Sequence, residues 1–342
     1  MNSNHLAGKF RSFAIEECRN SSPLYEFLAM KIAEDEEILE LASKGRGGQP
    51  IPNLLFGAVH YLLLKGNEHE LREFYPSLVK KPRKSEESLN YFRDFCVQKS
   101  KEINEILTNK IVQTNEVSRC SYLYPAFSYI YRMTKKPLAL IEIGTSAGLQ
   151  LLVEKYKYSY GTERNYGFKN SDVHISAEIR GDYTPLNQLS NFNVASRIGI
   201  DLHINDVSDE EDYLWLKSLI WPEHQERREL FEKAACYVRN NTLKLIEGDG
   251  VELLESISKY IPDDQIICVF HTHVANQMPI ETKERLLQNI KNVGEKRDIF
   301  HLYNNIQDRD LHLDYYLNGK ESLNKIAETE GHGRWFTWLM PD

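Results

Sequence analysis

The sequence predicts an α/β protein in which a mostly parallel sheet with flanking helices follows an all-helical amino-terminal subdomain. Up to about residue 135, apolar residues recur at helical spacing. From Leu138 onward, short apolar runs alternate with helical patterns, which is typical of parallel strands connected by helices. The chain has 342 residues, enough for two domains. We therefore expect a helical cap over residues 1–135 and a sheet domain over residues 136–342.

Three segments predict the helices of the cap. The first has Ser22 as N-cap, followed by proline, and ends at Gly45. The second, NLLFGAVHYLLLKG over residues 53–66, is apolar on nearly every side, which indicates a helix inside a bundle. The third covers residues 89–107 and places most of its apolar residues on one face.

Five apolar runs are the candidate strands of the sheet domain: residues 138–143, 196–202, 243–248, 265–271 and 297–304. Helical patterns fill most of the gaps, over residues 149–156, 212–238 with a break at Pro222, 251–260 and 280–292. Residues 161–195 do not fit this alternation. We expect an irregular or β-hairpin insertion there.

Charge and composition argue against several classes of protein. The formal net charge of -8 disfavours nonspecific binding to nucleic acid or to anionic membranes, because both need a positive surface. The amino terminus lacks the apolar core of a signal peptide, and no run reaches the length of a membrane span, so we expect a cytoplasmic protein. Five cysteines without CxxC spacing suggest neither a disulfide framework nor a thiolate zinc site.

The first candidate strand leads into a turn of small residues, EIGTSAG. Gly144 and Gly148 allow a tight turn and a close approach to a ligand, and the amides of the following helix favour electron-rich groups. A dinucleotide fingerprint fails because Ser146 and Leu149 stand where its second and third glycines belong, which disfavours a nicotinamide dehydrogenase. A structural turn without any cofactor remains an alternative.

Three acids lie at the ends of three successive candidate strands. Glu142 precedes the first glycine by two residues, where a carboxylate suits a cationic amine such as that of S-adenosylmethionine. Asp201 ends the second strand and can accept hydrogen bonds from ribose hydroxyls. Asp249 follows the third and can accept from an adenine amine, with the amide of Gly250 facing the ring. Asp201 and Asp249 can instead be helix N-caps.

A glycine turn, a ribose acid and an adenine acid in this order resemble the core of class I S-adenosylmethionine-dependent methyltransferases. The resemblance implies a Rossmann-like, methyltransferase-type sheet, in which residues 161–195 are looped out because Asp201 lies far from the turn. Nearly the whole chain is also similar to the bacterial family of domain of unknown function 2332. The matching stretches are SPLYEFLA, PNLLFGAVHYLLL, VQTNEVSRC, EIGTSAGLQLL, GIDLHINDV, WLKSLIWPEH, EGDG, FHTHVANQMP and HGRW.

The fourth candidate strand runs into two alternating histidines, His271 and His273, with Asn276 close behind. On an extended segment the histidines share one face. We predict that His271 is a general base that takes a proton from the methyl acceptor. The alternatives are hydrogen-bonded structural histidines or a two-histidine metal site, for which the local sequence supplies no third ligand.

Residues elsewhere are candidates for binding the acceptor. Asn115, Glu116 and Arg119 lie in VQTNEVSRC, just before the first strand. The alternative there is a helix cap with a surface ion pair between Glu116 and Arg119. Trp221 in IWPEH is a further candidate, or else fills the core.

We therefore expect a methyltransferase that uses S-adenosylmethionine and holds a small-molecule acceptor between the cap and the sheet. Neither nucleic acid nor a membrane is an expected partner, and no metal is expected. The alternative from another class is a noncatalytic protein of the same fold that binds a nucleoside ligand or a protein partner. Turnover of the cofactor separates the two.

Overall fold

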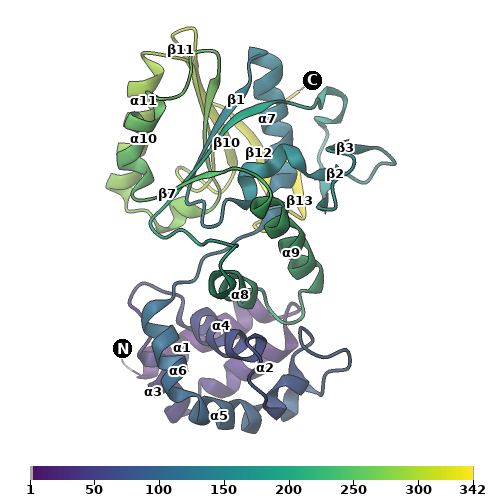
Figure 1. The fold of residues 1–342 in the computed structure, drawn as a ribbon, viewed down its shortest axis with the longest axis vertical. Helices are drawn as coiled ribbons and strands as arrows, with labels where there is room; N and C mark the ends of the chain where they lie inside the picture. The colour runs from purple at the N-terminus through teal and green to yellow at the C-terminus, as the bar shows by residue number, and fades with distance from the viewer. Residues whose placement is uncertain (1–2, 342) are drawn as a thin grey trace. The chain divides into compact units, whose positions relative to one another are not determined.

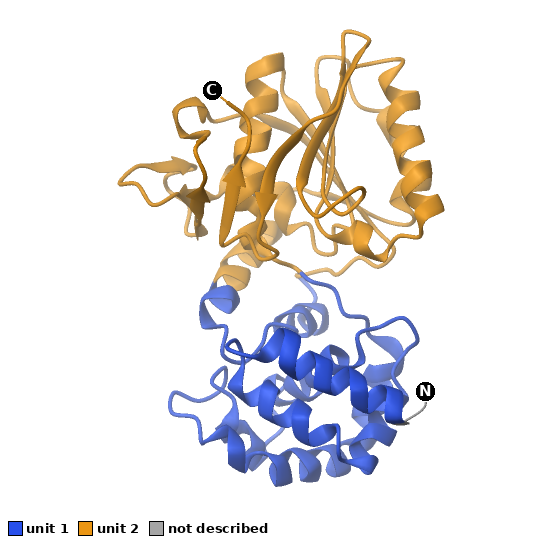
Figure 2. Ribbon diagram, turned by 180° about the vertical axis from the view of Figure 1, so that it is seen from behind, with its two compact units in different colours: residues 1–114, 208–229 blue, residues 115–207, 230–342 orange. Residues whose placement is uncertain are grey.

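The computed structural model describes residues 3–341 (Figure 1). The chain divides into two compact units, residues 1–114 with 208–229 and residues 115–207 with 230–342 (Figure 2). The predicted boundary at residue 135 is therefore displaced, and part of the second half of the chain joins the helical unit. Two contacts explain this division. Phe127 packs edge-on against Phe270 of the sheet, and Trp215 is buried in the core of the helical unit.

The first unit is helical, as predicted. Its α-helices are α1 (Ser3–Ser12), α2 (Pro23–Ile32), α3 (Glu36–Ser43), α4 (Ile51–Leu64), α5 (Leu89–Gln98), α6 (Ser100–Asn109) and α8 (Glu210–Ser218). Helix α4 is buried on nearly every side, because its sequence is apolar all round. Two predicted helices are each divided in the structure. Asp35 caps α3 and ends the first pattern, and Lys99 separates α5 from α6.

The second unit contains all five predicted strands, and they are parallel. These are β1 (Leu138–Ile143), β6 (Val194–Asp201), β7 (Lys244–Glu247), β8 (Ile266–His271) and β9 (Ile299–Tyr303). Their spatial order is β7-β6-β1-β8-β9. The central strand, β1, is buried along its whole length, as the uninterrupted apolar run predicts.

The sheet continues beyond β9 with antiparallel strands, which makes it mixed. These are β10 (Leu311–Leu317), β11 (Lys320–Ser322), β12 (Lys325–Thr329) and β13 (Trp335–Trp338). The predicted insertion at 161–195 does form β-structure. It contributes β5 (Glu178–Arg180) to the edge of the large sheet and pairs β3 (Asn165–Gly167) and β4 (His174–Ser176) with β2 (Lys157–Ser159).

Helices cover both faces of the sheet (Figure 1). On one face, α10 (Gly250–Ser258) and α11 (Ile280–Gly294) pack on aliphatic residues of the parallel strands. Helix α7 (Cys120–Thr134) covers the other face. The remaining helix, α9 (Gln225–Arg239), follows the break at Pro222. In residues 3–341, no helix is long and apolar enough to cross a membrane.

The helix predicted directly after β1 is wrong in type. Residues Leu149–Lys155 form a short 3₁₀ helix, η5, with a kink at Leu152. Two of its carbonyl oxygens are bound by tyrosine hydroxyls, because Tyr156 donates to Leu149 at 2.6 Å and Tyr158 donates to Val153 at 2.5 Å. These tyrosines flank the start of β2, and we infer that they compete with the backbone bonds of a regular α-helix.

Candidate functional site

The five parallel strands end at one side of the sheet, here called the carboxyl edge, and most predicted site residues lie along it. Strand order reverses at β1, whose neighbours are β6 on one side and β8 on the other. In open α/β sheets, ligands bind beyond the carboxyl ends of the strands at such a reversal. This edge is built entirely from residues of the second unit.

The turn after β1 has the tight geometry that its glycines predict. Gly144, Ser146 and Gly148 all have positive φ angles, of 75°, 51° and 76°. A Cβ atom on Gly144 would lie 2.1 Å from Cγ2 of Val274, so no other residue fits without displacement. Ser146 adopts a conformation that is unfavourable for a residue with a side chain, and it is held there by hydrogen bonds.

Asp201 fixes this turn. One carboxylate oxygen accepts from the backbone N–H of Ser146 at 2.7 Å, and the other accepts from that of His203 at 3.2 Å. The Ser146 hydroxyl in turn accepts from the amide nitrogens of Asn115 at 2.9 Å and Asn205 at 3.0 Å. The predicted ribose acid therefore joins β6 to the glycine turn, and Asn115 lies at the same turn.

Glu142 is buried, and its environment favours the neutral acid. Its side chain accepts a hydrogen bond of 2.6 Å from the Thr145 hydroxyl. Burial raises the pKa of Glu142 to about 8, against the opposing effect of the Thr145 bond and with a further contribution from the charge of Asp201. The prediction placed a carboxylate here to meet a cation. Without such a cation, most of Glu142 is protonated at neutral pH.

Asp249 is the N-cap of α10, which is the alternative considered for it. One oxygen accepts from the backbone N–H groups of Val251 at 2.8 Å and Glu252 at 3.3 Å. Its other oxygen lies 3.9 Å from the guanidinium of Arg285. A Cβ on Gly250 would lie 2.9 Å from Cγ2 of Ile143, so this glycine allows α10 to pack on β1.

The structure does not support the prediction that His271 is a general base. The residue is fully buried, and its Nε2 lies 3.3 Å from Nε2 of His301 on β9. Burial lowers the pKa of His271 to about 3. A general base must come within hydrogen-bond reach of a substrate proton, and this fully buried side chain, which contacts His301 and Tyr303 of β9, does not. The expected shared face with His273 is also wrong, because the strand ends at His271 and His273 is no longer extended, with a φ of 61°.

His273 is more exposed than His271 and lies just beyond the carboxyl end of β8. It is half-buried, with a positive φ of 61°, and its backbone N–H donates to the Asn304 side chain at 2.7 Å. Its Nδ1 lies 3.5 Å from the amide nitrogen of Asn305. Its Nε2 is buried and has no hydrogen-bond partner within the described residues. Burial lowers the pKa of His273 to about 4, so the imidazole is neutral at physiological pH.

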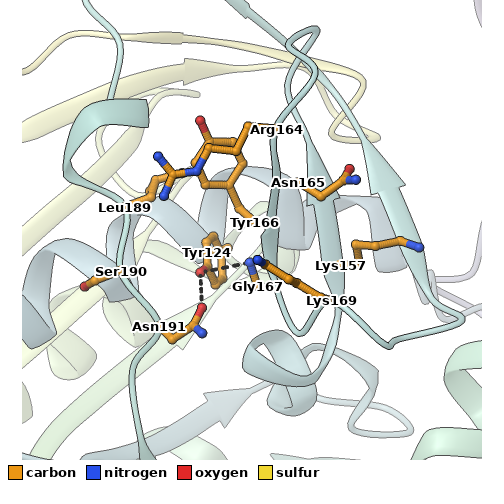
Figure 3. A pocket seen from close by; sticks show the side chains of 10 residues that line it. All are labelled: Tyr124, Lys157, Arg164, Asn165, Tyr166, Gly167, Lys169, Leu189, Ser190 and Asn191. Atoms are coloured by element: carbon orange, nitrogen blue, oxygen red, sulfur yellow. Dashed lines mark hydrogen bonds between the residues drawn. The ribbon is translucent and has the colours of Figure 1, made fainter.

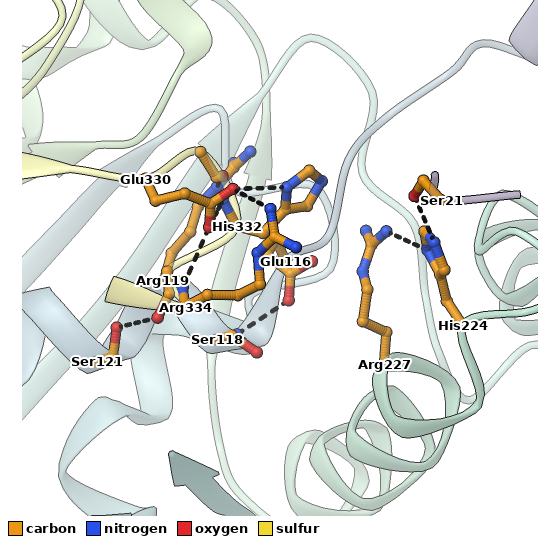
Figure 4. Close-up of polar contacts among 12 residues, drawn as sticks. Ser21, Glu116, Ser118, Arg119, Ser121, His224, Arg227, Glu330, His332 and Arg334 are labelled. Carbon is orange, nitrogen blue, oxygen red and sulfur yellow. Dashed lines mark hydrogen bonds and ion pairs between the residues drawn. The ribbon is translucent and has the colours of Figure 1, made fainter. Parts of the chain in front are cut away.

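Arg119 and Glu116 are buried rather than paired on the surface (Figure 4). Arg119 donates to the Gly331 carbonyl at 2.9 Å and to the Thr272 hydroxyl at 3.4 Å. The Glu116 carboxylate caps the short helix before α7 by accepting from the backbone of Ser118 at 3.1 Å. Arg119 thus connects the segment before β1 with the end of β8 and with the carboxyl-terminal region.

Sequence reasoning missed three polar residues at this edge, Gln150, Asn304 and Asn305. The Gln150 side chain accepts a hydrogen bond from the Thr272 hydroxyl at 3.2 Å and donates one to the Glu116 carbonyl at 3.2 Å, so it links three segments. Asn304 and Asn305 orient His273. The dipeptide Asn304-Asn305 at the end of a predicted strand was an available signal, whereas nothing local marks Gln150 as more than a helix residue.

Trp221 and Asn276 were also predicted to contact the methyl acceptor. Trp221 belongs to the helical unit and packs edge-on against Phe13 at 5.5 Å and Tyr25 at 6.2 Å, which is the core alternative. Asn276 is exposed on the short helix Val274–Gln277. Residues 3–341 contain no group of three or more His, Cys, Asp or Glu side chains that could hold a metal ion.

Comparison with known proteins places the chain by family. No curated protein and no solved structure matches it. A family model does match, over residues 7–338, and its description is "Uncharacterized protein conserved in bacteria (DUF2332)". Because this match covers nearly the whole chain, including both units and the carboxyl edge, the protein belongs to the DUF2332 family.

Proposed function

We propose that the second unit is a Rossmann-like, methyltransferase-type domain that binds S-adenosylmethionine at the carboxyl edge and methylates a small molecule. One observation carries the proposal. The parallel strands have the order β7-β6-β1-β8-β9, the glycine turn follows the central strand, and Asp201 ends the neighbouring strand and holds that turn. This is where a parallel α/β sheet binds a nucleoside ligand.

The residues at this edge suit the parts of the cofactor. The two Asp201 oxygens accept backbone hydrogen bonds from Ser146 and His203, and we assign ribose hydroxyls to their remaining acceptor capacity. The next residue, Leu202, is 76% exposed and offers an apolar surface beside Asp201 for a flat adenine ring. Asp249, with one oxygen outside the N-cap bonds, is the proposed acceptor for the adenine amine.

Glu142, Gly144, Ser146 and Gly148 are the proposed contacts of the amino-acid end of the cofactor. A cationic amine near Glu142 would lower the pKa of its carboxyl, because an opposite charge favours the ionised form. Starting from a pKa of about 8, Glu142 would then lose its proton on binding. We therefore expect cofactor binding to release a proton. Calorimetric titration in buffers of different ionisation enthalpy detects this release.

The cofactor supplies a methyl group made electrophilic by a sulfonium. The protein must align an acceptor and remove its proton where one is released. We assign the second task to His273 in place of His271. Its imidazole is neutral, and its Nε2 is buried without a hydrogen-bond partner in the described residues, so this atom can accept a proton from a bound acceptor. A weak base suffices, since methylation makes the proton on the acceptor atom more acidic. Asn115 and Arg119 remain the proposed acceptor contacts.

A noncatalytic protein that binds a nucleoside ligand is the second candidate. One observation favours it: Glu142, Asp201 and Asp249 each have hydrogen-bond partners within the chain, which gives all three a structural task. Such a protein would bind the cofactor without consuming it. Screening acceptors for conversion of bound S-adenosylmethionine to S-adenosylhomocysteine distinguishes the two candidates.

Calorimetric titration of the full chain with S-adenosylmethionine, S-adenosylhomocysteine and NAD tests the proposal. Asp201→Asn removes the charge and one strong acceptor, and we expect it to weaken the adenosyl ligands by roughly tenfold or more. Asp264→Asn is the matched control, because this exposed aspartate lies just before the amino end of β8, at the opposite edge of the sheet. Binding of NAD alone, or equal effects of both variants, would contradict the proposal.

A further inference from the structure

A chemically different cavity lies on the small sheet of the insertion. Its volume is about 570 Å³, within the range of roughly 300 to 1,000 Å³ that is usual for small-molecule sites. Segments from α7, β2, β3 and the loop before β6 line it, all within the second unit (Figure 3). None of the sequence motifs considered for the carboxyl edge contributes to it.

Three cations line this cavity: Lys157, Arg164 and Lys169. None of them forms an ion pair with a carboxylate in the described part of the chain, and no described lining residue is acidic. This grouping is unexpected in a chain with a net charge of -8. Like charges around one cavity repel each other, and a bound anion relieves that repulsion.

The cavity wall is held in place by specific contacts. The Tyr124 hydroxyl accepts from the backbone N–H of Gly167 at 3.2 Å and donates to the Asn191 side chain at 3.2 Å, so it joins β3 to the facing loop. The Arg164 guanidinium lies 5.0 Å from the centre of the Tyr166 ring. Burial raises the pKa of Tyr124 to about 12, with Arg164 acting in the opposite direction, so Tyr124 remains a neutral hydroxyl.

We propose that this cavity binds a small molecule that carries a phosphate group. Arg164 and Lys169 supply a guanidinium and an ammonium group, which together match the charge of a phosphate ester or pyrophosphate better than that of a single carboxylate. Neutral donors are present beside them, since the side-chain amides of Asn165 and Asn191 line the same space. This inference does not depend on the function proposed for the carboxyl edge.

Titration of the full chain with inorganic phosphate, pyrophosphate and citrate, at constant ionic strength, tests the inference. We expect pyrophosphate to bind more tightly than phosphate. Arg164→Gln and Lys169→Gln should each weaken pyrophosphate binding by roughly tenfold, because each removes a charge-assisted contact. Lys296→Gln is the control, since this exposed lysine follows α11 and does not line the cavity.

Three results would overturn the inference. The first is no binding of either phosphate compound at millimolar concentration to a folded protein. The second is equal weakening by Lys296→Gln and the two cavity variants, which would indicate general electrostatic attraction. The third is binding of citrate alone with the same dependence on Arg164 and Lys169, which would exclude phosphate as the recognised group.

Discussion

The two halves of the carboxyl edge differ in how completely their polar groups are used. In the half formed by β1, β6 and β7, Glu142, Asp201 and Asp249 each accept hydrogen bonds from neighbouring residues. In the half formed by β8 and β9, His273 keeps a buried nitrogen without a described partner and a positive φ. The acids of the first half thus stabilise the edge besides their proposed binding roles. Buried nitrogens without a described partner occur in the second half at His271, His301, Asn304 and His273, and of these residues only His273 is not fully buried.

The largest effect is expected where the two halves meet. Gly144→Ala places a Cβ against Val274 and also strains a φ of 75°. We expect a loss of roughly 2–4 kcal/mol in the free energy of unfolding, measured by urea denaturation. Gly319→Ala is the control, because Gly319 has a φ of 73° and nothing within 4 Å of its added Cβ. It should lose only about 1 kcal/mol in the free energy of unfolding. An equal loss in both variants would contradict the expected clash between Gly144→Ala and Val274.

A change in pH tests the buried acid of the first half. The pKa of Glu142 is raised from 4.5 to about 8 by burial, so the unfolded chain releases this proton at lower pH than the folded chain does. Glu142 should therefore reduce stability progressively as pH rises from about 4.5 to about 8. We expect the difference in unfolding free energy between Glu142→Gln and the wild type to grow in favour of the variant over that range. A difference that is constant with pH would show that Glu142 is ionised in the folded protein.

The pH profile of the unfolding free energy must be compared between Glu142→Gln and the wild type, because buried histidines change stability with pH in the opposite direction to Glu142. The pKa of His271 and that of His273 are lowered by burial to about 3 and about 4. The unfolded chain binds these protons below about pH 6.5, so the histidines reduce stability as pH falls below that value. Both forms of the protein contain them, and their contribution cancels in the difference.

The smallest expected effect is at His273. In contrast to the loss of stability at Gly144, we expect no loss there. Glycine at this position removes the strain of a left-handed φ and the buried nitrogen that lacks a partner. We expect His273→Gly to retain wild-type stability or to gain up to about 1 kcal/mol in thermal or urea unfolding. His271→Gly is the comparison, since it removes a fully buried side chain and should destabilise the protein. Strong destabilisation by His273→Gly would mean that His273 has a structural role.

The sequence predicted features that depend on local pattern. The five parallel strands, the apolar helix α4 and the tight turn at Gly144 all follow from spacing and from residue type. Features that depend on pairing between distant segments were not predictable in the same way. The burial of His271 results from its position opposite β9, and Trp215 joins the helical unit from the other half of the chain.

The same reasoning explains the mixed outcome at the candidate site. Asp201 was identified because it ends a strand, but its bond to the backbone of Ser146 requires β1 and β6 to be neighbours. The helix after β1 was predicted from its apolar spacing. It is a 3₁₀ helix, and two of its carbonyl oxygens accept hydrogen bonds from Tyr156 and Tyr158, which follow it in sequence.

Hydrogen–deuterium exchange of the full chain with and without S-adenosylhomocysteine tests the central claim most directly. The account predicts slower exchange in the turn at residues 144–148 and in the segment at residues 201–205. Both lie at the proposed cofactor site and are joined by the Asp201–Ser146 hydrogen bond. Unchanged exchange in both segments under saturating ligand, or protection confined to residues 157–169 of the cationic cavity, would contradict binding at the carboxyl edge.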